Sequence, residues 1–351
     1  MAKIAILGDT HFGARNDLKI FHEFFKKFYM DTFIPYLIEN DIKIVIQLGD
    51  LFDRRKYINY YSLDECKRYF FDRLNEHGIE LHTLVGNHDI YWRDSLAINS
   101  SSLVLGEYYN VHVHQDPATI EIQNTKIDII PWICTENYDE ITEFIKNSKS
   151  DICLGHFEIA GFAMYKGMEC HDGLSMNMFN KYEQVWSGHY HTRSKKENIT
   201  YVGTPYEMTW QDFADPKGFH TFDLETRKLE FYENPNHIFV RLEYDDLNKS
   251  PIDLRAYDLA GCLVKLVVVN KTDFYKFDIF LNSLYNKGCY EVKIIEDLSE
   301  YREGTVDEEI NLEDTVSVLS NYIDSVDTDL DKEKIKSFMR TLYTEAVNQE
   351  V

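Results

Sequence analysis

The sequence predicts an α/β fold in which two β-sheets are flanked by helices. The first indication is a short β-branched run at residues 43–49, which is typical of a strand buried on both faces of a mostly parallel sheet. The second is residues 18–40, where aromatic and aliphatic side chains recur at helical spacing and predict a helix that covers this sheet. The third is the alternation of apolar and polar residues between positions 111 and 131, which predicts antiparallel strands of a second sheet.

Five apolar runs in the first two thirds of the chain end in a glycine that is followed directly by a polar residue. The ligand-type residues that follow these glycines are Asp9, His11, Asp50, Asn87, His156, His189 and His191. In open α/β sheets, ligands bind beyond the carboxyl ends of the strands, so these side chains are expected to meet there. Asp, Asn and His bind Mn, Fe or Zn. Five unrelated turns would explain glycine and aspartate at strand ends but not the histidines.

The remaining elements of this region follow from periodicity and turn signals. Helices are predicted at 62–77, 95–107 and 138–149, and the first opens with a capping-box pattern formed by Ser62 and Glu65. Further strands are predicted at residues 200–203, 218–223 and 228–232. These elements complete one large domain.

A chain of 351 residues exceeds one ordinary hydrophobic core, and we expect three parts. Residues 1–235 form the large domain, because the turn cluster Asn234-Pro235-Asn236 marks a boundary. Residues 236–300 alternate strand, strand, helix and strand patterns and are predicted to form a small α/β capping domain. Residues 301–351 comprise an acidic linker and two amphipathic helices.

The two helices of this tail have apolar stripes but little domain of their own to cover them. We therefore expect them to dock onto another protein chain, with folding back onto their own domain as the alternative. The predicted partner-binding residues are Leu319, Ile323, Ile335, Phe338 and Leu342.

Charge is distributed unevenly along the chain. The net charge is −23, and residues 296–331 contain thirteen acidic residues against a single basic one, so that segment is a poor surface for DNA. Basic residues lie beside the strand-end motifs instead, and the predicted DNA-binding residues are Arg54, Arg55, Lys56 and Arg93. No signal peptide and no membrane-spanning run is evident, and the six cysteines are scattered, so a cytoplasmic protein is expected.

Seven ligand-type residues are too many for one ion and suit two ions that share a carboxylate. Asp50 is the predicted bridge, because its strand is expected to be central in the sheet. A pair of ions can clamp a phosphate and activate water, so the predicted chemistry is phosphoester hydrolysis. His88 is not needed as a ligand and is predicted to protonate the leaving oxygen or stabilise the transition state; hydrogen bonding to a ligand is the alternative.

The motifs Asp-x-His, Gly-Asp-x-x-Asp, Gly-Asn-His-Asp, Gly-His and Gly-His-x-His, in this order, resemble those of the calcineurin-like metallophosphoesterase superfamily. More narrowly, the chain is similar to SbcD-type DNA double-strand-break repair nucleases, including their bacteriophage branch. Segments 49–53, 130–132, 155–161 and 203–205 and the cap-plus-tail arrangement carry this narrower resemblance, which covers nearly the whole length.

The resemblance implies a two-sheet metallophosphoesterase sandwich with two Mn²⁺ ions, with Mg²⁺ as an alternative. Asp9, His11 and His191 would hold one ion together with the bridging Asp50, and Asn87, His156 and His189 would hold the other. His88 matches the catalytic histidine of the family.

The resemblance also bears on Asp53 and on partners. Asp53 stands where archaeal and eukaryotic relatives have a second catalytic histidine and is a predicted catalytic residue. The bacterial and phage branch also has Asp at this position, which leaves open its role in selecting exonuclease activity. A homodimer through residues 62–77 and 95–107 is implied, and so is an SbcC-type ABC ATPase bound by the tail.

The predicted function is therefore a Mn²⁺-dependent DNA nuclease, with duplex exonuclease and single-strand endonuclease activity in DNA end processing, recombination, replication and repair. One alternative is a protein phosphatase or nucleotide phosphodiesterase on the same fold, although phosphatases usually have Arg-Gly where this chain has Arg54-Arg55. A second is an inactive scaffold subunit, against which the intact ligand set argues. Cleavage polarity is left open by the sequence.

Overall fold

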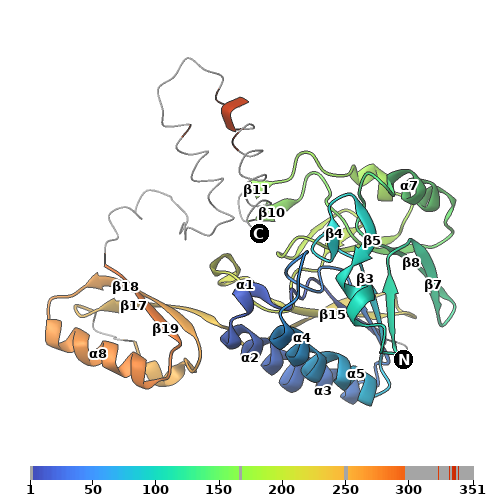
Figure 1. Ribbon diagram of the computed structural model, residues 1–351. Helices are drawn as coiled ribbons and strands as arrows, with labels where there is room; N and C mark the ends of the chain where they lie inside the picture. Colours follow the sequence, from blue (N-terminus) through green and yellow to red (C-terminus); the bar gives the residue numbers. More distant parts are fainter. Residues whose placement is uncertain are drawn as a thin grey trace. The chain divides into compact units, whose positions relative to one another are not determined.

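The computed structural model describes residues 3–165, 168–248 and 252–296, together with residues 323, 332, 334–336 and 339 (Figure 1). These residues divide into two compact units. The first lies within Met1–Arg241, Asp253–Lys265 and Phe280–Lys293, and the second within Leu242–Ile252, Leu266–Ile279 and the described residues from Ile294 onward. The predicted three-part division at residues 235 and 300 stays a prediction.

The first sheet has six strands in the order β16-β15-β1-β2-β3-β6. Strands β1, β2, β3 and β6 run parallel, and β15 and β16 extend the sheet antiparallel beside β1. In sheet order the strands are Leu229–Glu233, Gly218–Asp223, Lys3–Leu7, Ile44–Gln47, Glu80–Leu84 and Val111–His114. The central position predicted for the strand that precedes Asp50 is therefore observed, because β2 lies between β1 and β3.

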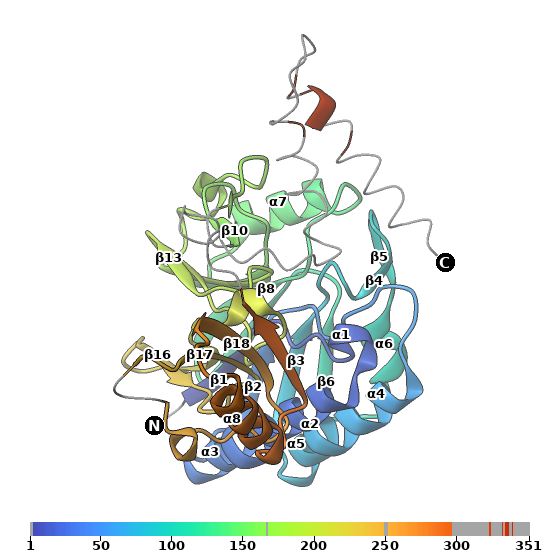
Figure 2. The ribbon, with the colours of Figure 1, turned by 90° about the vertical axis from the view of Figure 1, so that its left-hand side faces the viewer.

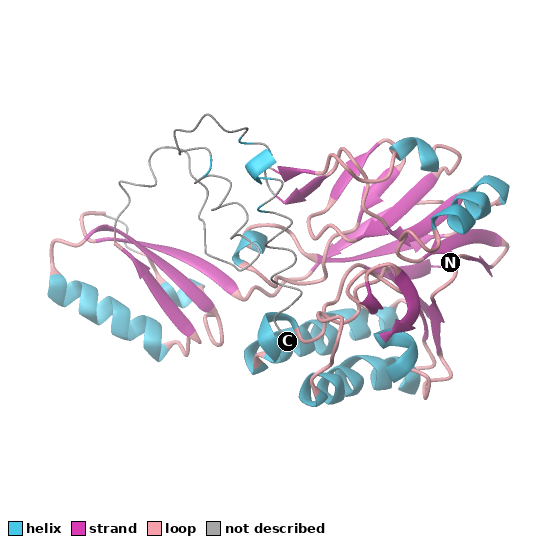
Figure 3. Cartoon of the chain, turned by 45° about the horizontal axis from the view of Figure 1, so that its top comes forward, coloured by secondary structure: helices cyan, strands magenta, loops and turns pink. Residues whose placement is uncertain are grey.

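The second sheet also has six strands, in the order β13-β14-β12-β9-β8-β7. Strands β14, β12, β9 and β8 run parallel, whereas β13 and β7 pair antiparallel at the two edges. The strands are Ser194–Lys196, Ile199–Tyr201, Gln184–Gly188, Ile152–His156, Thr125–Ile130 and Ala118–Ile122. Figure 3 shows the strands of the second sheet beside those of the first. A shared apolar core lies between the two sheets. Within this core, the ring of Trp186 in β12 lies 4.5 Å from that of Phe222 in β15, measured between ring centroids.

Helices cover the other face of the first sheet (Figure 2). Two long helical segments, each interrupted by a π-helical turn, cover most of this face, and their aromatic side chains fill the core between the helices and the sheet. One runs through α2 (Lys19–Phe28), the turn Tyr29–Phe33 and α3 (Ile34–Glu39), and the other through α4 (Tyr60–Cys66), the turn Lys67–Phe71 and α5 (Asp72–Glu76). The helices predicted at 18–40 and 62–77 are these two segments.

Shorter elements complete the first unit. They are α1 (Ala14–Asp17), α6 (Ser100–Val104), α7 (Tyr138–Asn147), the hairpin of β4 (Ile90–Trp92) and β5 (Ser95–Asn99), the pair β10 (Ala163–Tyr165) and β11 (Met168–Glu169), and the 3₁₀ turns Met176–Phe179, Trp210–Asp212 and Leu254–Ala256. None of the helices within the described residues is long and apolar enough to cross a membrane.

A third sheet has three strands in the order β17-β18-β19, with α8 beside it. These elements are β17 (Phe239–Asp245), β18 (Leu263–Asn270), α8 (Phe274–Asn286) and β19 (Glu291–Ile295). Phe277 of α8 packs against Tyr244 of β17 with ring centroids 5.0 Å apart. The strand, strand, helix and strand order predicted after residue 236 is thus observed.

Three local predictions are wrong. Residues 95–107 do not form one helix, because residues 95–99 pair with β4 as a strand and only α6 is helical. Strand β6 belongs to the first sheet rather than the second, since it pairs with β3 and its valines pack on the helix-side core. The capping box is absent, because Asn59 caps α4 by accepting from the backbone N–H of Tyr61 at 2.9 Å, whereas Ser62 is buried and donates to Asp17 at 2.5 Å.

Two of the five predicted partner-binding residues lie among the residues that the structure describes. Ile323 and Ile335 are described and have helical conformation, whereas Leu319, Phe338 and Leu342 lie outside the described residues.

Candidate metal centre

The seven predicted ligands come from five strands of the two large sheets. Asp9 and His11 follow β1, Asp50 follows β2 and Asn87 follows β3, while His156 ends β9 and His189 and His191 follow β12. These strands run parallel within each sheet, so their carboxyl ends deliver the polar side chains to one edge of the sandwich. Asp9, Asp50 and His156 are each at most 1% exposed.

The backbone at this edge is held in unusual conformations. His11, Asp50 and His189 have positive φ angles of 41°, 50° and 84°, which residues other than glycine rarely adopt. Such conformations cluster at functional sites, where the surrounding structure maintains them. Gly86 is required for a related reason, because a Cβ atom there would overlap the carboxylate of Asp50. The chain is therefore folded to bring these side chains together.

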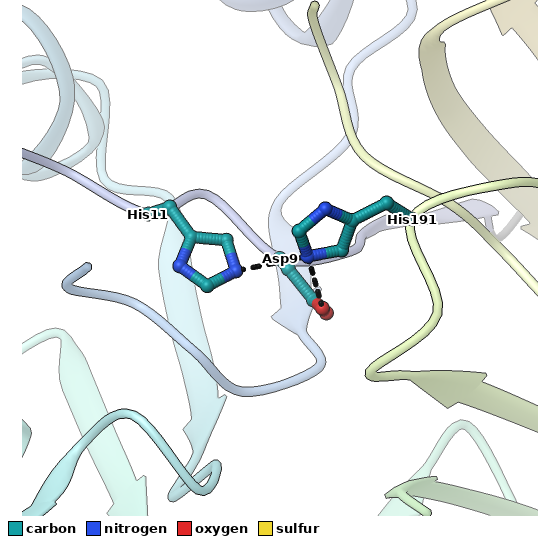
Figure 4. A group of neighbouring side chains, drawn as sticks. All are labelled: Asp9, His11 and His191. Atoms are coloured by element: carbon teal, nitrogen blue, oxygen red, sulfur yellow. Dashed lines mark hydrogen bonds and ion pairs between the residues drawn. The ribbon is translucent and has the colours of Figure 1, made fainter. Parts of the chain in front are cut away.

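Asp9, His11 and His191 form a first group whose ligand atoms lie within 4.8 Å of one another (Figure 4). The Nε2 atoms of His11 and His191 are 3.1 Å apart, and Nε2 of His191 lies 3.7 Å from Asp9. The backbone N–H of His189 donates to both carboxylate oxygens of Asp9, each at 3.0 Å, and so fixes this carboxylate in place.

Asp50, His156 and His189 form a second group within the same distance limit. The side-chain oxygen of Asn87 joins them, 2.9 Å from Nε2 of His156 and 3.0 Å from Nδ1 of His189. Nδ1 of His156 donates to the carbonyl of Leu48 at 2.7 Å. Because a carbonyl can only accept, Nε2 of His156 is the nitrogen that can bind an ion, and the hydrogen bond fixes this tautomer.

The charges in these groups fit divalent cations. Burial, with repulsion from Asp50, raises the pKa of Asp9 to about 6. Although burial opposes it, the nearby carboxylates of Asp50 and Asp9 raise the pKa of His156 to about 9. The two buried carboxylates are therefore stabilised by nearby positive charge. Protons on the histidines supply this charge unless a bound metal ion takes the place of the protons. Carboxylate, imidazole and amide donors together suit Mn, Fe or Zn.

His88 and Asp53, the two predicted catalytic residues, contact each other and the first group. Nδ1 of His88 donates to the backbone carbonyl of Asp53 at 2.7 Å, and its ring lies 5.0 Å from that of His11. The carboxylate of Asp53 is 3.5 Å from Nδ1 of His11. Burial acts to lower the pKa of His11, but this contact with Asp53 and the charge of Asp50 outweigh burial and raise that pKa to about 10. Asp53 therefore contacts two histidines, His11 through its carboxylate and His88 through its backbone carbonyl.

Two residues of the site were not predicted from the sequence. Asp89 is fully buried and accepts from the backbone N–H groups of Leu51 at 3.0 Å and Gly86 at 2.9 Å, so it ties the loop after β2 to the loop after β3. The sequence feature that could have identified Asp89 is its position as the last residue of the Gly-Asn-His-Asp motif. Trp132 packs its ring 5.2 Å from that of His189, and only tertiary contact reveals this.

The predicted DNA-binding residues are placed differently from one another. Arg55 and Arg93 line a cavity of about 750 Å³ that also includes Asn87 and His189. Arg54 contacts Asn16 and Tyr57 and does not line this cavity. Lys56 is exposed. Burial and the neighbouring Arg93 lower the pKa of Arg55, so two cationic groups stand close together beside the metal-ligand groups.

A sequence model of the calcineurin-like phosphoesterase family matches residues 2–193. The chain is 36% identical over 349 residues to exonuclease subunit 1 of Enterobacteria phage T4, covering 98% of this chain and 99% of that protein. Solved structures give weaker likenesses. An archaeal phosphodiesterase has 12% identity and a TM-score of 0.34, with 66% of this chain and 99% of that one covered. GAP50 of Plasmodium has 12% identity and a TM-score of 0.41, with 85% of this chain and 98% of that one covered. By its motifs, its fold and the first two matches, the chain belongs to the calcineurin-like phosphoesterase family.

Proposed function

We propose that this chain is a Mn²⁺-dependent DNA nuclease that hydrolyses phosphodiester bonds with two metal ions. The observation that carries the proposal is the arrangement of two metal-ligand groups beside a cavity lined by Arg55 and Arg93. The similarity to the phage exonuclease subunit over nearly the whole chain supports DNA as the substrate. The activity comprises duplex exonuclease and single-strand endonuclease cleavage during DNA end processing, recombination, replication and repair in the host cytoplasm.

Asp50 takes the role of the bridging ligand. Its Oδ2 lies 3.8 Å from Nε2 of His11 in the first group and 3.3 Å from Nε2 of His156 in the second. When bound, two divalent ions would neutralise charge on the phosphate and activate a water molecule for in-line attack. In this proposal Asp9, His11 and His191 would hold one ion, Asn87, His156 and His189 would hold the other, and Asp50 would contribute to both.

His88 takes the role of proton donor to the leaving oxygen. Its Nδ1 hydrogen is committed to the carbonyl of Asp53, so Nε2 is the nitrogen through which it exchanges a proton. The guanidinium groups of Arg55 and Arg93 would hold the phosphates of the DNA strand in the adjoining cavity.

The proposal is tested by incubating the purified protein with Mn²⁺ and an end-labelled DNA duplex, beside a phosphopeptide and a cyclic nucleotide. We expect cleavage of DNA that EDTA abolishes and that Asp50→Asn lacks. Turnover of the phosphopeptide or the cyclic nucleotide with no cleavage of DNA would place the chain among the other phosphoesterases. A lack of turnover on every substrate, with the fold intact, would support the scaffold alternative.

We further propose that the tail binds an ABC-type ATPase through Leu319, Ile323, Ile335, Phe338 and Leu342. The phage relative is named as a subunit of an exonuclease, which supports a partner protein. Deletion of residues 310–351 should leave Mn²⁺-dependent cleavage by the isolated protein nearly intact and abolish co-purification with the ATPase. Undiminished binding by the truncated protein would contradict the assignment.

A homodimer is the remaining part of the proposal. Within the segment 95–107, Ile98 and Leu103 are 41% and 72% exposed, which suits a surface buried by a second copy. Leu103→Glu should convert the dimer to a monomer in analytical ultracentrifugation, whereas a sedimentation coefficient equal to that of the wild type would reject this interface.

A further inference from the structure

Four polar side chains lie together on one face of two neighbouring strands, away from the candidate metal centre. Strands β3 and β6 run parallel, with His82 opposite His112 and Leu84 opposite His114. Because successive side chains of a strand point to opposite faces, Glu80 and His82 on β3 share a face with His112 and His114 on β6. Strand β6 is the edge strand of its sheet.

The imidazole rings of this edge cluster are stacked. The ring of His82 lies 4.8 Å from that of His112 and 5.2 Å from that of His114, with interplanar angles of 28° and 19°. Nδ1 of His82 is 2.9 Å from Nε2 of His114. Stacking and the short nitrogen contact hold the rings of both strands in fixed positions.

The spacing of the donors suits one metal ion. Glu80, His82 and His112 each offer a ligand atom, and these atoms lie within 4.8 Å of one another. Two nitrogens bound to a tetrahedral zinc ion at about 2.0–2.1 Å are about 3.3 Å apart. Glu80 and His112 are exposed, so their side chains have room for the small movement that would close the site.

The edge cluster is separate from the candidate metal centre. His82 lies within β3, whereas Asn87 lies in the turn beyond the carboxyl end of that strand, and none of the four cluster residues belongs to either ligand group of the candidate metal centre. None of the four cluster residues lines the cavity that contains Arg55 and Arg93. Loss of an ion here would leave the candidate centre with all of its ligands.

We propose that Glu80, His82 and His112, with His114 in contact with His82, bind one zinc ion that clamps the edge strand β6 to β3. Two imidazoles and a carboxylate are nitrogen and oxygen ligands that zinc binds in proteins, with a water molecule in the fourth tetrahedral position. An ion shared by two strands would hold an edge that is paired on one side only within the described sheet. This site does not depend on the proposed nuclease activity.

The test compares zinc binding by the full chain and by variants, measured as ions per chain after equilibrium dialysis. His112→Ala removes an exposed ligand and should bind one ion fewer than the wild type. The matched control His77→Ala, which alters a histidine at the end of α5, should bind as many ions as the wild type. Glu80→Gln should keep the site but weaken its affinity at least tenfold.

Two further measurements make the result decisive. Crystals of the full chain soaked in zinc should give an anomalous peak within bonding distance of His82 and His112. Mn²⁺-dependent phosphodiester hydrolysis by His112→Ala should equal that of the wild type, which shows that the variant is folded and that the sites are independent. Equal zinc stoichiometry in the wild type and His112→Ala, or no anomalous peak between the two strands, overturns the proposal.

Discussion

The Nε2 atoms of His11 and His191 lie 3.1 Å apart, although 180 residues separate the two histidines along the chain. Burial and the neighbouring His11 lower the pKa of His191 to about 3, so His191 is neutral at pH 7 and presents a lone pair. Two imidazole nitrogens that face each other share a proton between them, or both bind one cation. The buried carboxylate of Asp9 beside them favours the cation.

A first prediction concerns stability in the presence of metal. Mn²⁺ at about 100 times its dissociation constant should raise the free energy of unfolding by about 2.7 kcal/mol for each ion bound, because only the folded chain holds the ligands together. Thermal unfolding in Mn²⁺ and in EDTA measures the effect. Asp50→Asn should lose most of it, while Asp116→Asn, at an exposed position, should retain it. The same shift in Asp50→Asn as in the wild type would refute the bridging role.

A second prediction separates proton donation by His88 from metal binding. His88→Ala should bind Mn²⁺ as the wild type does but cleave DNA about 10²–10⁴-fold more slowly, because the leaving oxygen then departs without a proton. A substrate with a p-nitrophenolate leaving group needs no such proton and should be hydrolysed with a much smaller loss. Rate losses of equal size on both substrates would show that His88 is not the proton donor.

A third prediction distinguishes positioning from catalysis at Asp53. Its carboxylate lies 3.5 Å from Nδ1 of His11, so Asp53→Asn should weaken orientation of that ligand and raise the Mn²⁺ concentration needed for activity about 10–100-fold. The maximal rate at saturating Mn²⁺ should remain close to that of the wild type, since the carbonyl that holds His88 is unchanged. A low maximal rate that excess Mn²⁺ does not restore would identify Asp53 as a catalytic residue instead.

A fourth prediction concerns the basic residues. Arg55 lines the cavity beside the metal-ligand groups, so Arg55→Gln should weaken DNA binding across sequences and reduce the slope of log K against log salt by about 1. Arg54→Gln provides the matched control, because Arg54 is engaged by Asn16 and Tyr57 and its loss should leave the slope unchanged. The reverse pattern in the two variants would move the DNA path to Arg54.

A fifth prediction concerns Lys217, which positions the loop of His191. Its buried ammonium group donates to the carbonyl of His191 at 2.8 Å and pairs with Asp212 at 2.7 Å and Asp215 at 2.8 Å. Lys217→Met leaves a buried carboxylate without its cation and should destabilise the fold by about 3–5 kcal/mol. Chemical denaturation measures this loss.

The pH dependence of this effect provides its control. In the wild type, Lys217 holds the pKa of the buried Asp212 below its usual value against the effect of burial, so the stability from this pair is present above pH 4 and is lost only in stronger acid. In Lys217→Met the pKa of Asp212 should rise above its unfolded value, so the difference in stability between the variant and the wild type should widen as the pH increases from 5 to 8. A parallel pH profile for both proteins would show that the pair contributes no charge stabilisation.

Local sequence patterns were enough to identify the residues that could form the candidate centre. Each ligand lies within three residues of a glycine that ends an apolar run, and both the run and the turn are encoded within a few neighbouring residues. The same local encoding explains why the strands that precede Asp9, Asp50 and Asn87, and the long helices between them, were predicted correctly. Strand period and helix period are properties of the segment alone.

The pairing of strands and the contacts between distant side chains could not be predicted from local sequence, because they depend on the packing of the whole chain. Residues 111–114 alternate as any strand does, and the choice of β3 as partner depends on contacts with helices far away in sequence. The buried bonds of Asp89 across two loops, and the separation of Arg54 from Arg55, depend likewise on distant neighbours. Sheet order and register are set by the packing of the whole core, so the sequence of a single strand does not specify which strand it pairs with.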